Sequence, residues 1–291
     1  MSSSSDQKRA RPDERSKNPK RMRESANDRT IVQYLYQYGM LSQVQFERLL
    51  ELKRSTVQRL LRRLFDHAYI ERLFFEQSTF GSSPAMYILD RKGYALLRRM
   101  GFEEFAGLPQ KDLSADHLKH MLAMNEVHLS VEKACKSAGY TLNTWWNDNR
   151  LRSHEVKIRT KRGSKSVSLI PDSYFSITVP DVGTTHCFLE VDRGSMDTAR
   201  FTDKIRAYVA FYKSGEFSKQ FDAQGFRVLT VVDGVGQGRV INLRNASAKL
   251  PAIGRRFWFT HLQALRAETV LNQPIWDIAG SDSQVPLISV R

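Results

Sequence analysis

Cysteine is scarce in this sequence: its 291 residues include two, Cys135 and Cys187. Both stand in apolar surroundings and show no paired spacing, which argues against a disulfide framework or a thiolate zinc site. No apolar run reaches the roughly 18 to 20 residues that a helix needs to cross a bilayer. The serine-rich, basic start lacks the apolar stretch of a secretion signal. We therefore expect a cytoplasmic protein with no membrane partner.

Signatures of several enzyme classes are also missing. Nothing resembles a serine or cysteine nucleophile with its base. Gly234-x-Gly236-x-Gly238 follows a predicted strand, but no clear helix follows it, so we expect a hairpin turn and no phosphate-binding loop. His117 and His120 share a helix face without a third ligand at suitable spacing, so packing or hydrogen bonding is favoured over metal binding.

Acidic residues are outnumbered, 31 against 45 Lys and Arg, which leaves a formal charge of +14. A chain this basic usually meets a polyanion, most commonly nucleic acid; the alternative is a generally basic protein without a specific partner. Residues 1–27 hold eight of the basic residues and almost no large apolar side chain, which predicts a disordered arm. This arm either contacts the phosphates of DNA or is a solvent-exposed tail that only keeps the chain in solution.

Residues 28–100 carry a helical pattern ending at Gly39, then a capping box of Ser42 with Gln45 that opens a second helix. Ser55 with Gln58 repeats that signature and predicts the start of a third helix. Strand-like runs at 71–77 and 85–89 follow, and a helix over 91–100 completes the unit. This order predicts a winged helix-turn-helix domain.

The third helix is expected to read DNA. Its apolar stripe (Val57, Leu60, Leu61 and Leu64) turns inward and leaves a polar, basic outer face. We expect Thr56, Gln58 and Arg59 to reach base edges, and the cations Lys53, Arg54, Arg62 and Arg63 to hold phosphates. The wing, near 78–83, would lie along the backbone or minor groove. The alternative is a protein-docking module whose arginines are only solvated.

The rest of the chain mixes helices and strands. Residues 101–114 are predicted to be a linker, and a long helix follows over 115–137. Strands are predicted at 141–146, 155–160, 166–172, 173–179, 186–191 and 226–232, with a helix at 197–213 before the last. The sequence thus predicts an α+β protein whose second domain covers 115–265, with a C-terminal extension over 266–291.

The second domain contains two acids at the ends of neighbouring predicted strands, Asp172 and Glu190. At one sheet edge they could share a divalent cation, and Mg²⁺ prefers such oxygen ligands. A bound Mg²⁺ would activate water for attack on a phosphodiester. Glu126, on the preceding helix, is a candidate third acid.

Pro171-Asp172 and Glu190-x-Asp192 together resemble the PD…(D/E)xK pattern of the restriction-endonuclease-like superfamily. More narrowly, the order of domains and motifs over about 28–260 resembles that of the replication-relaxation family of plasmids and integrative elements. The matching features are the winged helix, a helix with His117, His120, Asn125 and Glu126, the Trp145-Trp146 strand, Pro171-Asp172, Glu190-Val191-Asp192-Arg193-Gly194, and Lys204 with Tyr208. The resemblance implies a restriction-endonuclease-like α/β domain and a role in replication, relaxation or mobilisation of plasmid or mobile-element DNA in bacteria.

One position departs from the nuclease pattern, because Asp192 stands where a lysine is expected. That lysine positions the attacking water and stabilises negative charge, which an aspartate cannot do. Arg193 should point to the opposite face of its strand. Lys204, on the buried side of the next helix, is the preferred replacement. In the alternative to a catalytic site, the carboxylates of Asp172 and Glu190 have a structural role and pair with Arg193 or Arg206.

The hairpin between these motifs is basic. Lys157 and Arg159 are expected to share an exposed face of it that contacts DNA along its backbone. The alternative is a hairpin edge that is exposed only to solvent. Two main functions stay open, beside a third in which the chain is a protein-assembly module of a replisome or conjugation machine and binds DNA poorly. The first is a DNA-binding protein that nicks or relaxes DNA with Mg²⁺ held by Asp172 and Glu190. The second is a non-catalytic replication or transcription regulator on a degenerate nuclease-like domain. Expected partners are double-stranded DNA, replication or mobilisation proteins, and a second copy of the chain.

Overall fold

The computed structural model describes residues 14–74, 85–102, 113–147, 151, 156–159, 166–236, 238–250 and 255–289. The chain divides into two compact units, Met1–Leu122 and Ala123–Arg291. Helices and strands occur in both units, so the predicted α+β class is confirmed. The predicted wing at 78–83 and most of the predicted linker lie outside the described residues.

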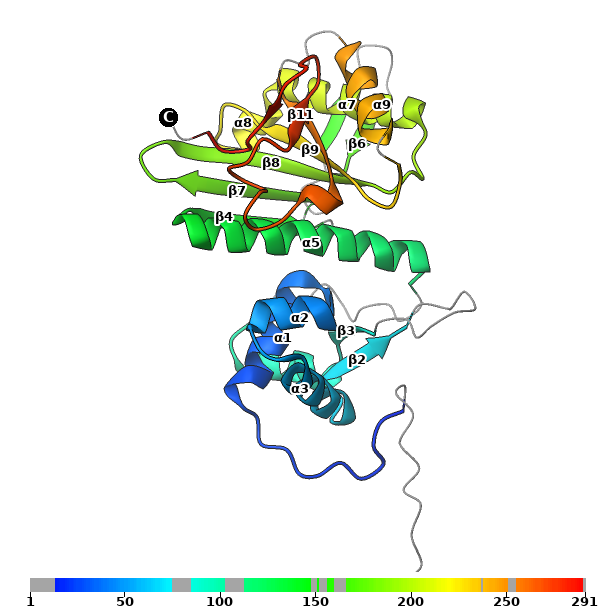
Figure 1. Ribbon diagram of the computed structural model, residues 1–291, viewed down its shortest axis with the longest axis vertical. Helices are drawn as coiled ribbons and strands as arrows, with labels where there is room; N and C mark the ends of the chain where they lie inside the picture. Colours follow the sequence, from blue (N-terminus) through cyan, green and yellow to red (C-terminus); the bar gives the residue numbers. More distant parts are fainter. Residues whose placement is uncertain are drawn as a thin grey trace, which may run out of the picture. The chain divides into compact units, whose positions relative to one another are not determined.

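The first unit begins with three helices: α1 (Ala26–Tyr38), α2 (Gln43–Leu50) and α3 (Arg54–Asp66). Strands β2 (Ile70–Leu73) and β3 (Met86–Leu89) follow, then α4 (Arg91–Arg99), as drawn in blue to cyan in Figure 1. The sequence did not predict β1 (Met40–Ser42), which pairs antiparallel with β3 and completes a sheet of order β1-β3-β2.

Caps explain where the helices begin. The predicted capping box of Ser42 with Gln45 is confirmed, and Ser25 with Asp28 forms a second one at the start of α1. The prediction that Ser55 and Gln58 cap the third helix is wrong. Its N-cap is Lys53, whose carbonyl accepts hydrogen bonds from the amides of Thr56 (2.9 Å) and Val57 (3.1 Å), so the helix starts before Ser55 can act as a cap.

The N-terminal segment differs from the predicted disordered arm. Residues 1–13 lie outside the described residues, but from residue 14 the chain contacts the first unit. Arg15 forms ion pairs with Glu71 (3.0 Å) and Asp90 (2.6 Å). The amide of Ser16 donates to Asp66 at 2.9 Å. These acids on β2, α3 and the N-cap of α4 hold a segment that has too little apolar surface to fold by burial alone.

The second unit is built on a seven-stranded sheet of order β12-β11-β10-β9-β8-β7-β4. Its strands are β4 (Thr141–Asn147), β7 (Ser173–Val179), β8 (Gly183–Asp192), β9 (Arg227–Val232), β10 (Phe257–His261), β11 (Trp276–Ile278) and β12 (Gln284–Val285). The β8–β9 and β9–β10 pairs are parallel, and the other pairs are antiparallel. A separate hairpin joins β5 (Val156–Arg159) and β6 (Ser166–Leu169).

Helices cover both faces of this sheet (Figure 1). On one face, α5 (Ala115–Ala138) packs Val127 and Val131 against Leu189 and Val191 of β8. The other face carries α7 (Thr198–Ser214), α8 (Glu216–Phe221) and α9 (Gly238–Ala248), which pack around Phe188 and neighbouring side chains. Successive residues of β8 therefore alternate between two cores, as a strand buried on both faces requires.

Two expectations for the end of the chain are corrected. The glycines after β9 do not form a hairpin turn, because α9 follows them and connects β9 to its parallel neighbour β10. The segment 266–291, predicted as an extension, supplies β11 and β12 to the same sheet. A 3-10 turn, η1 (Leu262–Ala264), lies between β10 and β11. Within the described part of the chain, no helix combines the length and apolarity that a membrane span requires.

His128 generates a pH-dependent prediction. Its ring is buried in α5 and stacks on Trp145 with 3.9 Å between ring centroids, and burial lowers its pKa from 6.5 to about 3. Because the unfolded chain takes up this proton below pH 6.5 and the folded chain does not, stability falls as pH drops from about 6.5 towards 3. We expect His128 to cost about 2 kcal/mol of unfolding free energy at pH 5 relative to pH 7.5.

Urea unfolding of the wild type and His128→Gln at both pH values measures this difference, which the variant should lack. The matched control is His117→Gln, an exposed histidine on the same helix, which should retain the wild-type pH dependence. Identical pH dependence in His128→Gln and the wild type would contradict a buried neutral imidazole.

Candidate functional site

The surface of α3 is the first candidate site. Its apolar stripe is buried as predicted: Val57, Leu60, Leu61 and Leu64 are at most 5% exposed. The opposite side leaves Lys53, Arg54, Gln58 and Arg59 exposed and Thr56 half-buried. Lys53 makes no side-chain cap, so no capping side chain competes with an anion for the first amides of the helix, those of Arg54 and Ser55. The start of α3 thus offers cations, a polar side chain and backbone donors together.

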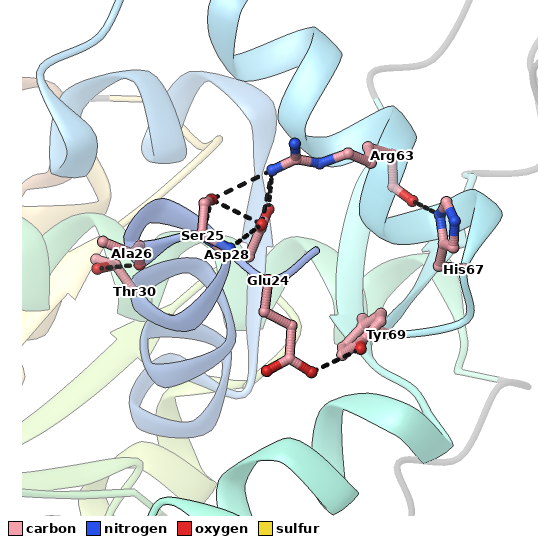
Figure 2. A network of polar contacts seen from close by, with 8 residues as sticks. All are labelled: Glu24, Ser25, Ala26, Asp28, Thr30, Arg63, His67 and Tyr69. Carbon is pink, nitrogen blue, oxygen red and sulfur yellow. Dashed lines mark hydrogen bonds and ion pairs between the residues drawn. The ribbon is translucent and has the colours of Figure 1, made fainter. Parts of the chain in front are cut away.

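The two arginines in the second half of α3 are differently placed. Arg63 forms an ion pair with the fully buried Asp28 (2.6 Å) and donates to Ser25 Oγ (3.2 Å), as Figure 2 shows. Arg62 pairs with Asp66 at 2.9 Å and donates to the carbonyl of Glu14 at 2.9 Å. These contacts fasten α3 to α1 and to the N-terminal segment. The prediction that Arg62 and Arg63 hold phosphates therefore loses its geometric support.

The second candidate site lies where β7 begins beside β8. Ser173 pairs with Leu189, and the amide of Asp172, just before β7, donates to the Leu189 carbonyl at 3.2 Å, which places Asp172 beside the stretch of β8 that contains Glu190. The negative charge of Asp172 is close enough to act on the carboxyl of Glu190. Asp172 Oδ2 also accepts from the amide of Val191 at 2.7 Å. The two acids predicted to meet at one sheet edge are thus brought together.

Two side chains of α7 complete this group. Lys204 forms an ion pair with Glu190 Oε2, and the hydroxyl of Tyr208, one helical turn later, donates to Oε1. The group is largely buried: Glu190 is 7% exposed and Tyr208 1%. Lys204 was the replacement lysine favoured by the sequence, and its ammonium reaches the predicted acid.

Burial governs the protonation of this group. It raises the pKa of Glu190 to about 7; Lys204 opposes this rise and the negative charge of Asp172 adds to it. Burial lowers the pKa of Lys204, but Glu190 and Asp172 outweigh this and leave it above its usual value. Burial and Glu190 together raise the pKa of Tyr208 well above 10. The Tyr208 hydroxyl therefore keeps its proton and donates it in the hydrogen bond to Glu190.

Asp192, the residue in the lysine position, has other partners. Its Oδ2 accepts from Arg239 Nε (3.0 Å) and Nη2 (2.6 Å), and its Oδ1 from the amide of Gly194 (2.6 Å). Arg193, one of the two arginines suggested to pair with the carboxylates, forms an ion pair with Asp233 at 3.2 Å. Arg239, on α9, was not singled out from the sequence because that helix was not predicted.

Other predicted site residues lie elsewhere. Glu126 is on α5, which packs against the face of the sheet opposite to the face that carries Glu190. Lys157 and Arg159 lie on β5, paired with β6, and their side chains fall outside the described structure. Arg206, the other suggested partner of the carboxylates, pairs with Asp203 on its own helix at 2.8 Å.

This arrangement does not fit a resident Mg²⁺. Both oxygens of Glu190 already accept hydrogen bonds, one of them from a cation. Burial also disfavours the charged carboxylate that a metal requires. Among the residues that the structure describes, no three His, Cys, Asp or Glu side chains form a group able to hold a metal ion.

Comparison with known proteins identifies a family. A family model described as replication-relaxation matches residues 32–224, which run from α1 to α8 and include β4, β7 and β8 of the seven-stranded sheet. No curated protein and no solved structure matches the chain significantly.

The Asp192–Arg239 pair generates a stability prediction. Asp192 is 8% exposed, and its removal leaves the guanidinium of Arg239 without its carboxylate in a largely buried place. We expect Asp192→Asn to lower the unfolding free energy by about 3 kcal/mol, measured by urea denaturation. The matched control is Asp203→Asn, whose exposed pair with Arg206 should contribute less than about 1 kcal/mol. Equal losses in the two variants would contradict a structural role for Asp192.

Proposed function

The chain belongs to the replication-relaxation family, and we propose that it binds double-stranded DNA of a plasmid or integrative element during replication, relaxation or mobilisation. The observation that carries this proposal is the exposed start of α3. There Lys53, Arg54 and Arg59 surround polar side chains and a helix N-terminus without a side-chain cap. Three helices followed by the β2–β3 hairpin support a winged helix-turn-helix with α3 as its recognition helix.

In this proposal the basic side chains of α3 and its N-cap have three roles: contact with bases, contact with phosphates, and positioning of the helix. Arg59 and Gln58 are exposed near the start of α3 and would contact base edges, while Lys53 and Arg54 would hold phosphates. Arg62 and Arg63 position the helix through Asp66 and Asp28. The formal charge of +14 adds a long-range attraction that raises the rate of encounter with DNA.

We further propose that the second unit grips DNA or a protein partner without cleaving DNA. The bonds from Lys204 and Tyr208 to Glu190, and the aspartate at position 192, support this choice. The competing function is Mg²⁺-dependent nicking by Asp172 and Glu190, with Lys204 as the displaced catalytic lysine. The approach of Lys204 to Glu190 is the observation in favour of that alternative.

Arg59→Ala tests the DNA-binding surface. The target is a duplex selected by the wild-type protein from a random pool, and affinity is measured by fluorescence anisotropy at several salt concentrations. Loss of one base-contacting arginine should weaken binding about 10-fold or more. Lys53→Ala should weaken binding to all sequences and lower the salt slope by about 1. Arg98→Ala, an exposed arginine on α4, is the matched control and should bind like the wild type. Wild-type affinity in both α3 variants would refute the proposed surface.

Supercoiled plasmid incubated with the protein and Mg²⁺ or Mn²⁺ tests the proposed lack of cleavage. The plasmid should stay supercoiled with the wild type, since the carboxylate that would hold the metal is already bonded to an ammonium. Conversion to nicked circles that requires the metal and disappears in Asp172→Ala and Glu190→Ala would establish the alternative. DNA affinity of the same samples, measured in parallel, separates missing cleavage from missing binding.

A further inference from the structure

Two acids of the second unit, Asp172 and Glu190, lie close together. Asp172, just before β7, lies beside Glu190 of β8, and its negative charge raises the electrostatic cost of ionising Glu190. Such a pair is stable as two carboxylates only when a cation lies close to both. Whether that cation is a metal ion or the ammonium of a lysine decides whether the site can bind a metal.

Lys204 supplies this cation from a fixed helix. Its ammonium is bonded to Glu190 and is also stabilised by the charge of Asp172. The helix cannot easily withdraw it, because Phe201, Ile205 and Phe211 of α7 are all at most 4% exposed in the core beneath. The ammonium therefore stays at the carboxylates through the packing of α7.

A third oxygen lies beside the acids. Thr230 on β9 pairs with Glu190, and the neighbouring pair Phe188 with Val228 shares the same core, so Thr230 and Glu190 lie on one face. The Thr230 side chain is 1% exposed, and its Oγ1 has no hydrogen-bond partner in the described structure. A buried hydroxyl without a partner costs free energy, whereas hydroxyl and carboxylate oxygens are ligands for hard divalent cations.

We infer that the ammonium of Lys204 takes the place of a metal ion between Asp172 and Glu190, and that a neutral side chain at position 204 opens a divalent-cation site made of these two carboxylates and Thr230. This inference rests on the proposal that the second unit does not cleave DNA. The protein then needs no divalent cation for stability, and one substitution is enough to create a metal site.

The experiment measures Mn²⁺ binding to the whole protein in the absence of DNA. Wild type and Lys204→Met are titrated with Mn²⁺, with bound metal counted by electron paramagnetic resonance and thermal unfolding recorded on the same samples. Lys204→Met should bind about one Mn²⁺ per chain. Its Tm should rise on the order of 5 °C when Mn²⁺ exceeds its Kd about 100-fold. The wild type should show neither effect.

Controls assign the metal to this place. Lys213→Met removes an exposed lysine of α7 and should behave like the wild type. Adding Glu190→Gln to Lys204→Met should abolish Mn²⁺ binding, and adding Thr230→Val should weaken it. A Lys204→Met chain that folds only with Mn²⁺ would support the inference, whereas one that stays unfolded at every Mn²⁺ concentration would overturn it.

Two results separate the inference from the proposed function. Mn²⁺ bound by the wild type and lost in Glu190→Gln would overturn the inference, because metal and Lys204 would then coexist. Metal-dependent nicking by the wild type would overturn the proposed lack of cleavage. Failure of DNA binding would affect neither measurement, because no DNA is present in the titration.

Discussion

Asp28 lies with none of its surface exposed between α1 and α3, where its carboxylate meets the guanidinium of Arg63. An ion without such a partner would cost several kcal/mol in a place that water does not reach. The same constraint acts in the second unit, where Glu190 joins β8 to α7 through Lys204 and Asp192 joins β8 to α9 through Arg239. Each pair ties one element to another, because removing either member leaves an uncompensated charge behind. Buried charge pairing therefore specifies how the helices of each unit lie on their neighbours.

This constraint also selects which cations are available to DNA. The sequence places basic residues along the whole of α3, and the pattern alone gives no reason to separate Arg59 from Arg63. The fold separates them, because Asp66 and Asp28 hold Arg62 and Arg63 in the second half of the helix, whereas Arg59 is exposed nearer its start. An arginine that holds a buried carboxylate cannot leave it for a phosphate without breaking the unit. The surface proposed to contact DNA is consequently the first two turns of α3, a smaller area than charge counting suggests.

Local patterns predicted most elements well. The apolar stripes and the Ser42 capping box placed the first helices, and the strand-favouring residues of 173–179 placed β7 without error. The sequence prediction failed where an element depends on distant partners. β1 exists because β3 pairs with it, and residues 14–25 are held by acids on β2, α3 and α4 that are distant in sequence. For the charged group, the strand ends predicted that Asp172 and Glu190 meet and helical spacing predicted Lys204. Thr230 and Arg239 could not be found, because their relevance depends on sheet register and on a helix that lacks a strong apolar pattern.

The aspartate at position 192 follows from the charge arrangement around it. Its side chain shares a face of β8 with Glu190, two residues earlier, and meets Arg239 at the start of α9. A lysine at this position would place its ammonium against that guanidinium, and two like charges in a largely buried site repel strongly. The same lysine would also duplicate the cation that Lys204 already provides to Glu190. A lysine could therefore stand at position 192 only if Arg239 and Lys204 changed with it, so the residue at this position of β8 is coupled to one residue on α7 and one on α9.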